Sequence, residues 1–229
     1  MSQAIQTAVA TAQAQWESWN DLGVSGRAQL LQRFANNLHN GSAQMALWQI
    51  DNAQRQIGDE MPLPGPTGEA NVLLTAGRGL FVITADSNAN ETAVIGQLVT
   101  ALIAGNVVIL AGEPHNLHVS LHKLLTQAGL PAGVVQVLGA DSPLETLIQR
   151  PELAGVAYCG NSRVAELNRL LAARDGNLAQ LVAETDCAKM PTLGSPYYLH
   201  RFITERTRTT NTTAVGGNAT LLELGGKED

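Results

Sequence analysis

The sequence predicts a doubly wound α/β domain, in which helices cover both faces of a parallel β-sheet. Two observations predict it. From residue 80 onwards, short runs rich in β-branched residues alternate with segments of helical length. These runs are continuously apolar and do not alternate with polar residues, as expected for strands buried on both faces. Such sheets bind ligands beyond the carboxyl ends of their strands, so candidate site residues are sought there.

Residues 1–60 are predicted to form a helical segment that packs on the core. An Ala- and Gln-rich stretch favours a first helix over 4–19. A second helix is predicted to begin at Ser25, whose hydroxyl is suited to an N-cap. Apolar residues recur at helical spacing from Leu30 to Leu38, so this helix presents one face to the core.

The sheet domain is predicted to span 61–194. It opens with a connector at 61–69, where three prolines and two glycines remove backbone donors and favour turns. Asn90 is a candidate N-cap for the first helix between strands, and Gly129 ends a later helix. The predicted strands are 80–84, 107–110, 134–138, 155–158 and 180–183, and the predicted helices are 91–105, 117–128, 144–149 and 162–173.

The last part of the chain, 195–229, is predicted to form a helix and a β-hairpin flap. Residues 203–213 are Thr-rich with alternating charges, a Gly-Gly turn follows, and 219–224 form a second apolar run. A two-stranded hairpin by itself is marginally stable in water, so it must pack on another surface. We therefore expect 203–224 to dock on another domain or on a second copy of the chain.

Composition excludes several classes of function. The formal net charge of −6 argues against a nucleic-acid partner, because neutralising phosphates requires a surplus of Lys and Arg. The uncharged run 92–112 has the length of a membrane span, but Gly105 and Asn106 indicate a helix end before a strand, so no span is predicted. Cys159 and Cys187 are too few for a disulfide framework and are interpreted as buried small apolar residues. Together with the lack of a secretory signal, this predicts a cytoplasmic protein.

Three histidines invite a metal interpretation. His118 and His122 are four residues apart on one face of a predicted helix, and His115 precedes them. No Asp or Glu is placed to complete a set on that face, whereas zinc requires three or four ligands. The histidines are therefore predicted to be solvated or capping residues, and no metal is expected.

Several runs of the sequence resemble the aldehyde dehydrogenase superfamily. The likeness is closest to the pyrroline-5-carboxylate dehydrogenase part of the bifunctional proline utilization A enzymes. The runs are Pro-Gly-Pro-Thr-Gly-Glu at 64–69, Arg-Gly-Leu-Phe-Val-Ile at 78–83, Gly-Gln-Leu at 96–98, Ala-Leu-Ile-Ala-Gly-Asn at 101–106, Gly-Leu-Pro-Ala-Gly at 129–133 and Leu-Ala-Gly-Val-Ala-Tyr-Cys-Gly-Asn-Ser at 153–162.

The ending resembles the C-terminus of the longer proline utilization A proteins, whose final domain is an aldehyde dehydrogenase-like fold without catalytic residues. Glu-Arg at 205–206, Asn-Thr-Thr-Ala at 211–214 and Gly-Gly-Asn-Ala-Thr-Leu at 216–221 carry this second likeness. The resemblance implies the Rossmann-like NAD-binding domain of the family, with N-terminal helices and a C-terminal hairpin flap.

The resemblance implies a non-catalytic domain, because the chain passes from its last predicted strand directly to the hairpin. In the family the nucleophilic Cys lies far beyond the general base, in a segment that does not intervene here. The implied function is docking through 203–224 on a catalytic dehydrogenase domain, or on a second copy, as a lid or pseudo-dimer partner. The alternative is a fragment of an NAD-dependent pyrroline-5-carboxylate dehydrogenase that retains cofactor binding. A nucleotide-binding module of unrelated use is a third possibility.

Two residues match catalytic positions of the family. Asn88, nine residues before Gln97, matches the Asn that stabilises the oxyanion. Glu184 matches the general base, although Asp186 and Cys187 replace the glycines that follow it in the family. Without a nucleophile both matches are interpreted as vestigial, and Cys187 is too close to Glu184 to replace the missing Cys.

The matches to the family's cofactor site are incomplete. Ala111 and Gly112 occupy the place of the Lys-Pro pair whose Lys contacts the adenosine ribose, and Glu113 adds a negative charge. The run Gly160, Asn161 and Ser162 precedes a helix whose N-terminus can receive a pyrophosphate. No bound cofactor is expected, and NAD is predicted to bind weakly if it binds.

Overall fold

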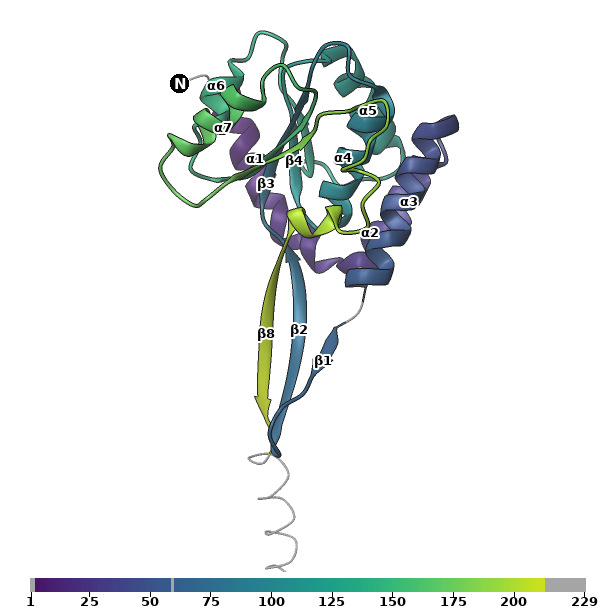
Figure 1. The fold of residues 1–229 in the computed structure, drawn as a ribbon, viewed down its shortest axis with the longest axis vertical. Helices are drawn as coiled ribbons and strands as arrows, with labels where there is room; N and C mark the ends of the chain where they lie inside the picture. Colours follow the sequence, from purple (N-terminus) through teal and green to yellow (C-terminus); the bar gives the residue numbers. More distant parts are fainter. Residues whose placement is uncertain (1–2, 59, 213–229) are drawn as a thin grey trace, which may run out of the picture. The chain divides into compact units, whose positions relative to one another are not determined.

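The computed structural model describes residues 3–58 and 60–212 (Figure 1). These residues divide into two units. The first comprises residues 3–58 and 76–203, and the second comprises residues 60–75 and 204–212.

The first unit contains a parallel sheet of five strands, in the order β5-β4-β3-β6-β7. All four neighbouring pairs are parallel. Every residue of β3 and β4 is buried, which explains their continuously apolar sequences. The strands are β3 (Leu80–Ala85), β4 (Val107–Leu110), β5 (Val135–Val137), β6 (Leu153–Cys159) and β7 (Gln180–Glu184).

Helices connect these strands and confirm the predicted doubly wound fold. Because parallel crossovers are right-handed, the change of direction in the strand order places α4 and α5 on one face of the sheet and α6 and α7 on the other. Asn90 caps α4 as predicted, since its Oδ1 accepts a hydrogen bond from the backbone N–H of Thr92 at 2.9 Å. The helices are α4 (Glu91–Ile103), α5 (His115–Gln127), α6 (Leu144–Ile148) and α7 (Val164–Ala172).

The N-terminal residues form three helices, α1 (Gln3–Asp21), α2 (Gly23–Ala35) and α3 (Asn40–Ile57). The expected N-cap at Ser25 is wrong, because α2 already begins at Gly23 and Ser25 lies inside it. Gly23 has a φ of 66°, a conformation that glycine adopts without strain, and it separates α1 from α2.

A buried arginine joins these helices to the core. The Arg27 guanidinium donates hydrogen bonds to the carbonyl oxygens of Ile103 at 2.9 Å and Asn20 at 2.6 Å. Burial lowers the pKa of Arg27 to about 10. The ends of α1 and α4, whose carbonyls lack helical partners, are thus tied together by one side chain.

The second unit contains a three-stranded sheet in the order β1-β2-β8, in which β1 and β2 are antiparallel. The strands are β1 (Met61–Leu63), β2 (Glu69–Gly77) and β8 (Ile203–Asn211). The prediction of a strand starting at 203 is confirmed, but the partner found for it is β2, a strand that the sequence analysis missed. The predicted second hairpin strand, 219–224, lies outside the described residues.

The unit boundaries differ from the ranges expected from sequence, because residues 195–203 belong to the first unit. A 3-10 helix, η1 (Tyr198–Phe202), lies in this stretch. The ring centroids of Phe202 and of Phe81 on β3 are 4.9 Å apart. The Asn106 side-chain amide donates a hydrogen bond to the Phe202 carbonyl oxygen at 2.9 Å. These non-local contacts attach the stretch to the sheet.

Within the described residues, no helix combines the length and apolar character that crossing a membrane requires. The uncharged run 92–112 is divided between α4 and β4, as the sequence predicted.

Candidate functional site

An open groove of about 370 Å³ lies at the carboxyl ends of the strands. Residues that end β3, follow β4 and begin α6 line it, together with Arg163 before α7. This is the edge at which doubly wound sheets bind their ligands. The groove is therefore the candidate functional site.

The start of α7 is the part of the groove that the sequence assigned to a pyrophosphate. Asp86, which follows β3, occupies the hydrogen-bond donors there. Its Oδ2 accepts from the backbone N–H groups of Asn161 at 3.2 Å and Ser162 at 3.3 Å, and its Oδ1 accepts from the hydroxyls of Tyr158 and Ser162. The chain's own carboxylate thus takes the place that an anionic ligand would take at this helix N-terminus.

The hydrogen bonds to Asp86 favour its ionised form. Burial by itself would raise the pKa of the carboxyl, but hydrogen bonds from Ser162, Tyr158 and Asn161 outweigh burial and hold the pKa below its usual value. Asp86 is therefore ionised at neutral pH.

Gly160 makes the close approach of Asp86 possible. A Cβ at this position would lie 2.3 Å from Oδ2 of Asp86, and the φ of 142° is one that other residues rarely adopt. The glycine that the sequence analysis matched to a phosphate site here accommodates a carboxylate.

The remaining charges of the groove are mostly negative. Glu113, Asp141 and Glu145 line it together with Asp86, and Arg163 is the single cationic residue among the described residues that do so. Arg163 is already paired with Glu145 at 2.8 Å and with Glu166 at 2.6 Å. The lining of the groove therefore carries more negative than positive charge.

Glu184, which the sequence resemblance matched to the family's general base, is completely buried. Its Oε2 accepts hydrogen bonds from the backbone N–H groups of Thr192 at 2.8 Å and Leu193 at 2.9 Å, and its Oε1 accepts from the N–H of Asp186 at 3.1 Å. The carboxylate holds both ends of the loop 185–193, which we call the Glu184 loop.

Asp186 stands where the family has a glycine, and it stabilises the first turn of the Glu184 loop. Its Oδ1 accepts from the backbone N–H groups of Ala188 at 3.2 Å and Lys189 at 3.0 Å. The backbone shape that the family obtains from glycines is thus replaced by a turn held by side-chain hydrogen bonds.

Asn88 lies exposed in the turn between β3 and α4. The N–H of Ala89 donates to the Asp86 carbonyl at 2.9 Å within this turn. The Glu184 carboxylate is buried against the Glu184 loop, so Asn88 and Glu184 do not share a solvent-accessible site.

The expectation that the three histidines are solvated or capping is wrong for His118. Its side chain is fully buried on the face of α5 that also presents Leu121 and Leu125. Among residues 3–58 and 60–212, neither ring nitrogen of His118 has a hydrogen-bond partner. Burial, with a smaller effect of nearby His115, lowers its pKa to about 4. The described part of the chain contains no group of three or more potential metal ligands.

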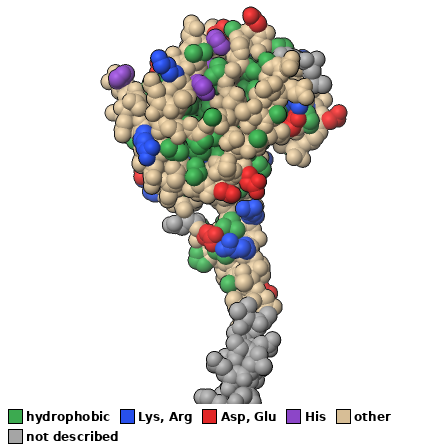
Figure 2. Space-filling model, turned by 180° about the vertical axis from the view of Figure 1, so that it is seen from behind, with side chains coloured by type: hydrophobic (Ala, Val, Ile, Leu, Met, Phe, Trp, Pro, Cys, Tyr) green, Lys and Arg blue, Asp and Glu red, His purple; other side chains and the backbone are tan. Residues whose placement is uncertain are grey.

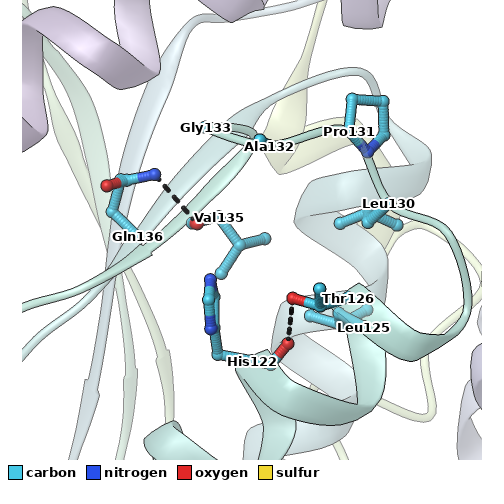
Figure 3. Close-up of a pocket in the computed structure, with 9 residues that line it drawn as sticks. All are labelled: His122, Leu125, Thr126, Leu130, Pro131, Ala132, Gly133, Val135 and Gln136. Carbon is cyan, nitrogen blue, oxygen red and sulfur yellow. Dashed lines mark hydrogen bonds between the residues drawn. The ribbon is translucent and has the colours of Figure 1, made fainter.

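A second cavity, of about 340 Å³, lies between the end of α5 and the start of β5 (Figure 3). His122 and Gln136 are the largest polar side chains around it, and the rest of its lining is mostly apolar. It is at the amino-terminal edge of the sheet, because it is bordered by the loop that leads into β5. Doubly wound folds bind their ligands at the other edge, so this cavity is a weaker candidate.

Charged side chains are scattered over the face of the molecule that Figure 2 shows, and Lys and Arg do not gather into a patch there. A nucleic-acid site would need such a patch. The view agrees with the negative net charge.

The comparisons with known proteins agree with the fold. The model of the aldehyde dehydrogenase family matches residues 41–190. The chain therefore belongs to the aldehyde dehydrogenase family.

Within this family, its homologues include PutA and pyrroline-5-carboxylate dehydrogenase. The bifunctional protein PutA of Rhizobium meliloti is 30% identical over 172 residues, which cover 74% of this chain and 13% of that protein. The mitochondrial delta-1-pyrroline-5-carboxylate dehydrogenase of Danio rerio is 32% identical over 111 residues, 46% of this chain and 20% of that enzyme. Proline utilization A of Bradyrhizobium japonicum superposes with a TM-score of 0.72 and 29% identity, over 79% of this chain and 22% of that one. The chain thus spans a small part of these relatives.

Asp86 was not predicted from the sequence as a site residue, although its carboxylate occupies the backbone donors at the start of α7. Its position directly after a buried strand was a usable signal, because side chains there lie at the ligand-binding edge. Its hydrogen-bond partners on β6 and before α7 are more than seventy residues away, and only the fold brings them together.

Proposed function

We propose that this chain is a non-catalytic aldehyde dehydrogenase-like domain of the proline utilization A type. It acts in the cytoplasm by docking on a catalytic dehydrogenase domain, or on a second copy, as a lid or pseudo-dimer partner in proline catabolism. The burial of Glu184 is the observation that carries this proposal. A general base must reach the proton that it abstracts, directly or through one water. A carboxylate whose oxygens accept from three backbone N–H groups is instead part of the loop's structure.

The short connection between β7 and β8 supports the same conclusion. Only residues 185–202 connect β7 to β8, and they form a turn and η1. Cys187 lies three residues after Glu184, and its Sγ is 3.5 Å from the Glu184 carbonyl oxygen. The Cys187 thiol lies against the backbone of Glu184, the residue matched to the general base. It is therefore not placed to attack a substrate between itself and the Glu184 carboxylate.

The exposed strand β8 supports the docking role. Its residues 204–211 are all exposed, and β8 is an edge strand of the described sheet. On the neighbouring β2, Val72, Leu73 and Leu74 are only partly buried. Exposed strand edges and uncovered apolar residues are features that proteins normally cover with a partner.

Deleting β8 tests the docking role. A chain that ends after Phe202 should lose self-association, or association with the catalytic dehydrogenase domain, because the edge that accepts the partner is gone. The sheet of the first unit should stay folded, since its five strands pair without β8. Size-exclusion chromatography, with circular dichroism to verify folding, measures both. Unchanged association of the folded, truncated chain would refute the proposed interface.

A fragment that retains cofactor binding is the second candidate function, favoured by Gly160 and by the position of the start of α7 at the ligand-binding edge of the sheet. The hydrogen bonds of Asp86 oppose it, because a pyrophosphate would have to displace a bound carboxylate.

An NAD titration of the Asp86→Ala variant separates the two candidates. We expect the unmodified chain to bind NAD with a dissociation constant above about 1 mM, which corresponds to less than about 4 kcal/mol. Asp86→Ala should bind at least about tenfold more tightly, because it frees two backbone N–H groups and removes a negative charge. Asp141→Ala, which removes a charge from the same groove without freeing donors, is the matched control. Submillimolar binding by the unmodified chain would favour the cofactor-binding fragment.

A further inference from the structure

The two cysteines of the chain meet at the carboxyl-terminal edge of the sheet. Cys159 is the last residue of β6, and its register partner on the neighbouring strand β7 is Glu184. Cys187 follows Glu184 closely in the sequence. The first part of the Glu184 loop therefore begins beside Cys159.

The turn after β7 brings Cys187 back toward the strand end. The Met190 N–H donates to the Asp186 carbonyl at 2.7 Å, so the chain reverses within this turn. The Cys187 thiol donates to the Glu184 carbonyl at 3.5 Å. It also faces Cys159 closely enough for each thiol to change the pKa of the other.

The two thiols differ in reactivity. Cys159 is fully buried, and burial raises its pKa well above the ordinary value of a thiol. Cys187 is partly exposed, and its contact with Cys159 lowers its pKa. The thiolate, and not the thiol, is the nucleophile that attacks an oxidant, so Cys187 reacts with an oxidant first.

We propose that Cys187 and Cys159 form a reversible disulfide when the protein meets a hydroperoxide. The Cys187 thiolate attacks the peroxide oxygen, the O–O bond breaks, and a sulfenic acid forms with release of water or, from an organic peroxide, an alcohol. The Cys159 sulfur then attacks the Cys187 sulfur, the S–O bond breaks, and a water molecule leaves. Two electrons pass from the thiols to one peroxide. A dithiol reductant restores both cysteines by thiol–disulfide exchange.

The disulfide would add a covalent link to a loop that Glu184 already holds. It would tie the end of β6 to the Glu184 loop, whose Met190 borders an apolar pocket of about 420 Å³ together with Met45 and Trp48 of α3. The disulfide would thus restrain the loop that carries Met190, and it does not depend on the docking role of β8.

Mass spectrometry of the full chain tests the proposal. After hydrogen peroxide treatment and blocking of free thiols, we expect a monomer that has lost two hydrogen atoms and gained no blocking group. Peptide mapping should join Cys159 to Cys187, and dithiothreitol should reverse the change. Two thiols that remain free, or disulfides between chains only, would overturn the proposal.

Two variants test the order of the steps. In Cys159→Ala the sulfenic acid at Cys187 cannot be resolved. The variant also removes the contact that lowers the pKa of Cys187, but Cys187 is partly exposed whereas Cys159 is buried. Dimedone should therefore label Cys187 in this variant at least about tenfold faster than it labels Cys159 in Cys187→Ala. Equal labelling rates in the two variants would refute the assignment of Cys187 as the attacking thiol. The mapping of the unmodified chain decides the existence of the disulfide even if Cys159→Ala does not fold.

Discussion

Replacing Glu184 by alanine is expected to lower the free energy of unfolding by about 3–5 kcal/mol, because three backbone donors lose their acceptor at a cost of about 1–3 kcal/mol each. The variant leaves the N–H groups of Asp186, Thr192 and Leu193 without their acceptor. Buried or half-buried donors without a partner pay the full desolvation penalty. Urea denaturation followed by circular dichroism measures the change.

Glu184→Gln and Glu166→Ala serve as comparisons for this result. Glutamine keeps one acceptor oxygen but points an NH2 group at a backbone donor, so it should destabilise the fold by less than alanine does. Glu166 belongs to a partly exposed ion pair with Arg163, and its removal should cost less than about 1 kcal/mol. If Glu184→Ala proved as stable as the unmodified chain, the carboxylate would not hold the loop, and a catalytic role would again be open.

The stability of the chain is expected to fall as the pH falls from about 6.5 towards 4, because of His118. Its pKa is about 4 in the folded chain and close to the ordinary 6.5 in the unfolded chain. Between these values the unfolded chain binds a proton that the folded chain does not, so acid favours unfolding. The stabilisation is complete above about pH 6.5, and up to roughly 3 kcal/mol of it is lost by pH 4.

His118→Leu isolates this effect. The leucine keeps an apolar side chain beside Leu121 and Leu125 and has no proton to bind. Urea midpoints measured from pH 7.5 to pH 4 should decline less steeply for the variant than for the unmodified chain. Parallel pH profiles for the two proteins would show that His118 does not control the acid sensitivity.

The core of the fold could be predicted because its signals are local. The apolar runs that became β3 and β4, the cap at Asn90 and the glycine at the end of α5 act through near neighbours in the chain. Each predicted strand and helix from 80 to 184 is present, with ends that differ by at most two residues. The strand β2 was missed because one of its partners, β1, lies in the Pro-rich connector and the other, β8, lies far away in the sequence.

Some residues of the candidate site could be identified from the sequence, but their contacts could not. The sequence alone determined the family, the presence of Glu184 and Gly160, and the unfavourable charge of Glu113, because motifs and charges are readable residue by residue. Only the tertiary structure decided which groups these residues contact: it buried the Glu184 carboxylate under three N–H groups and placed Asp86 on the donors beside Gly160. The physical reason is that burial and hydrogen-bond partnership are set by segments distant in sequence, and these determine whether a carboxylate is a catalyst or part of the structure.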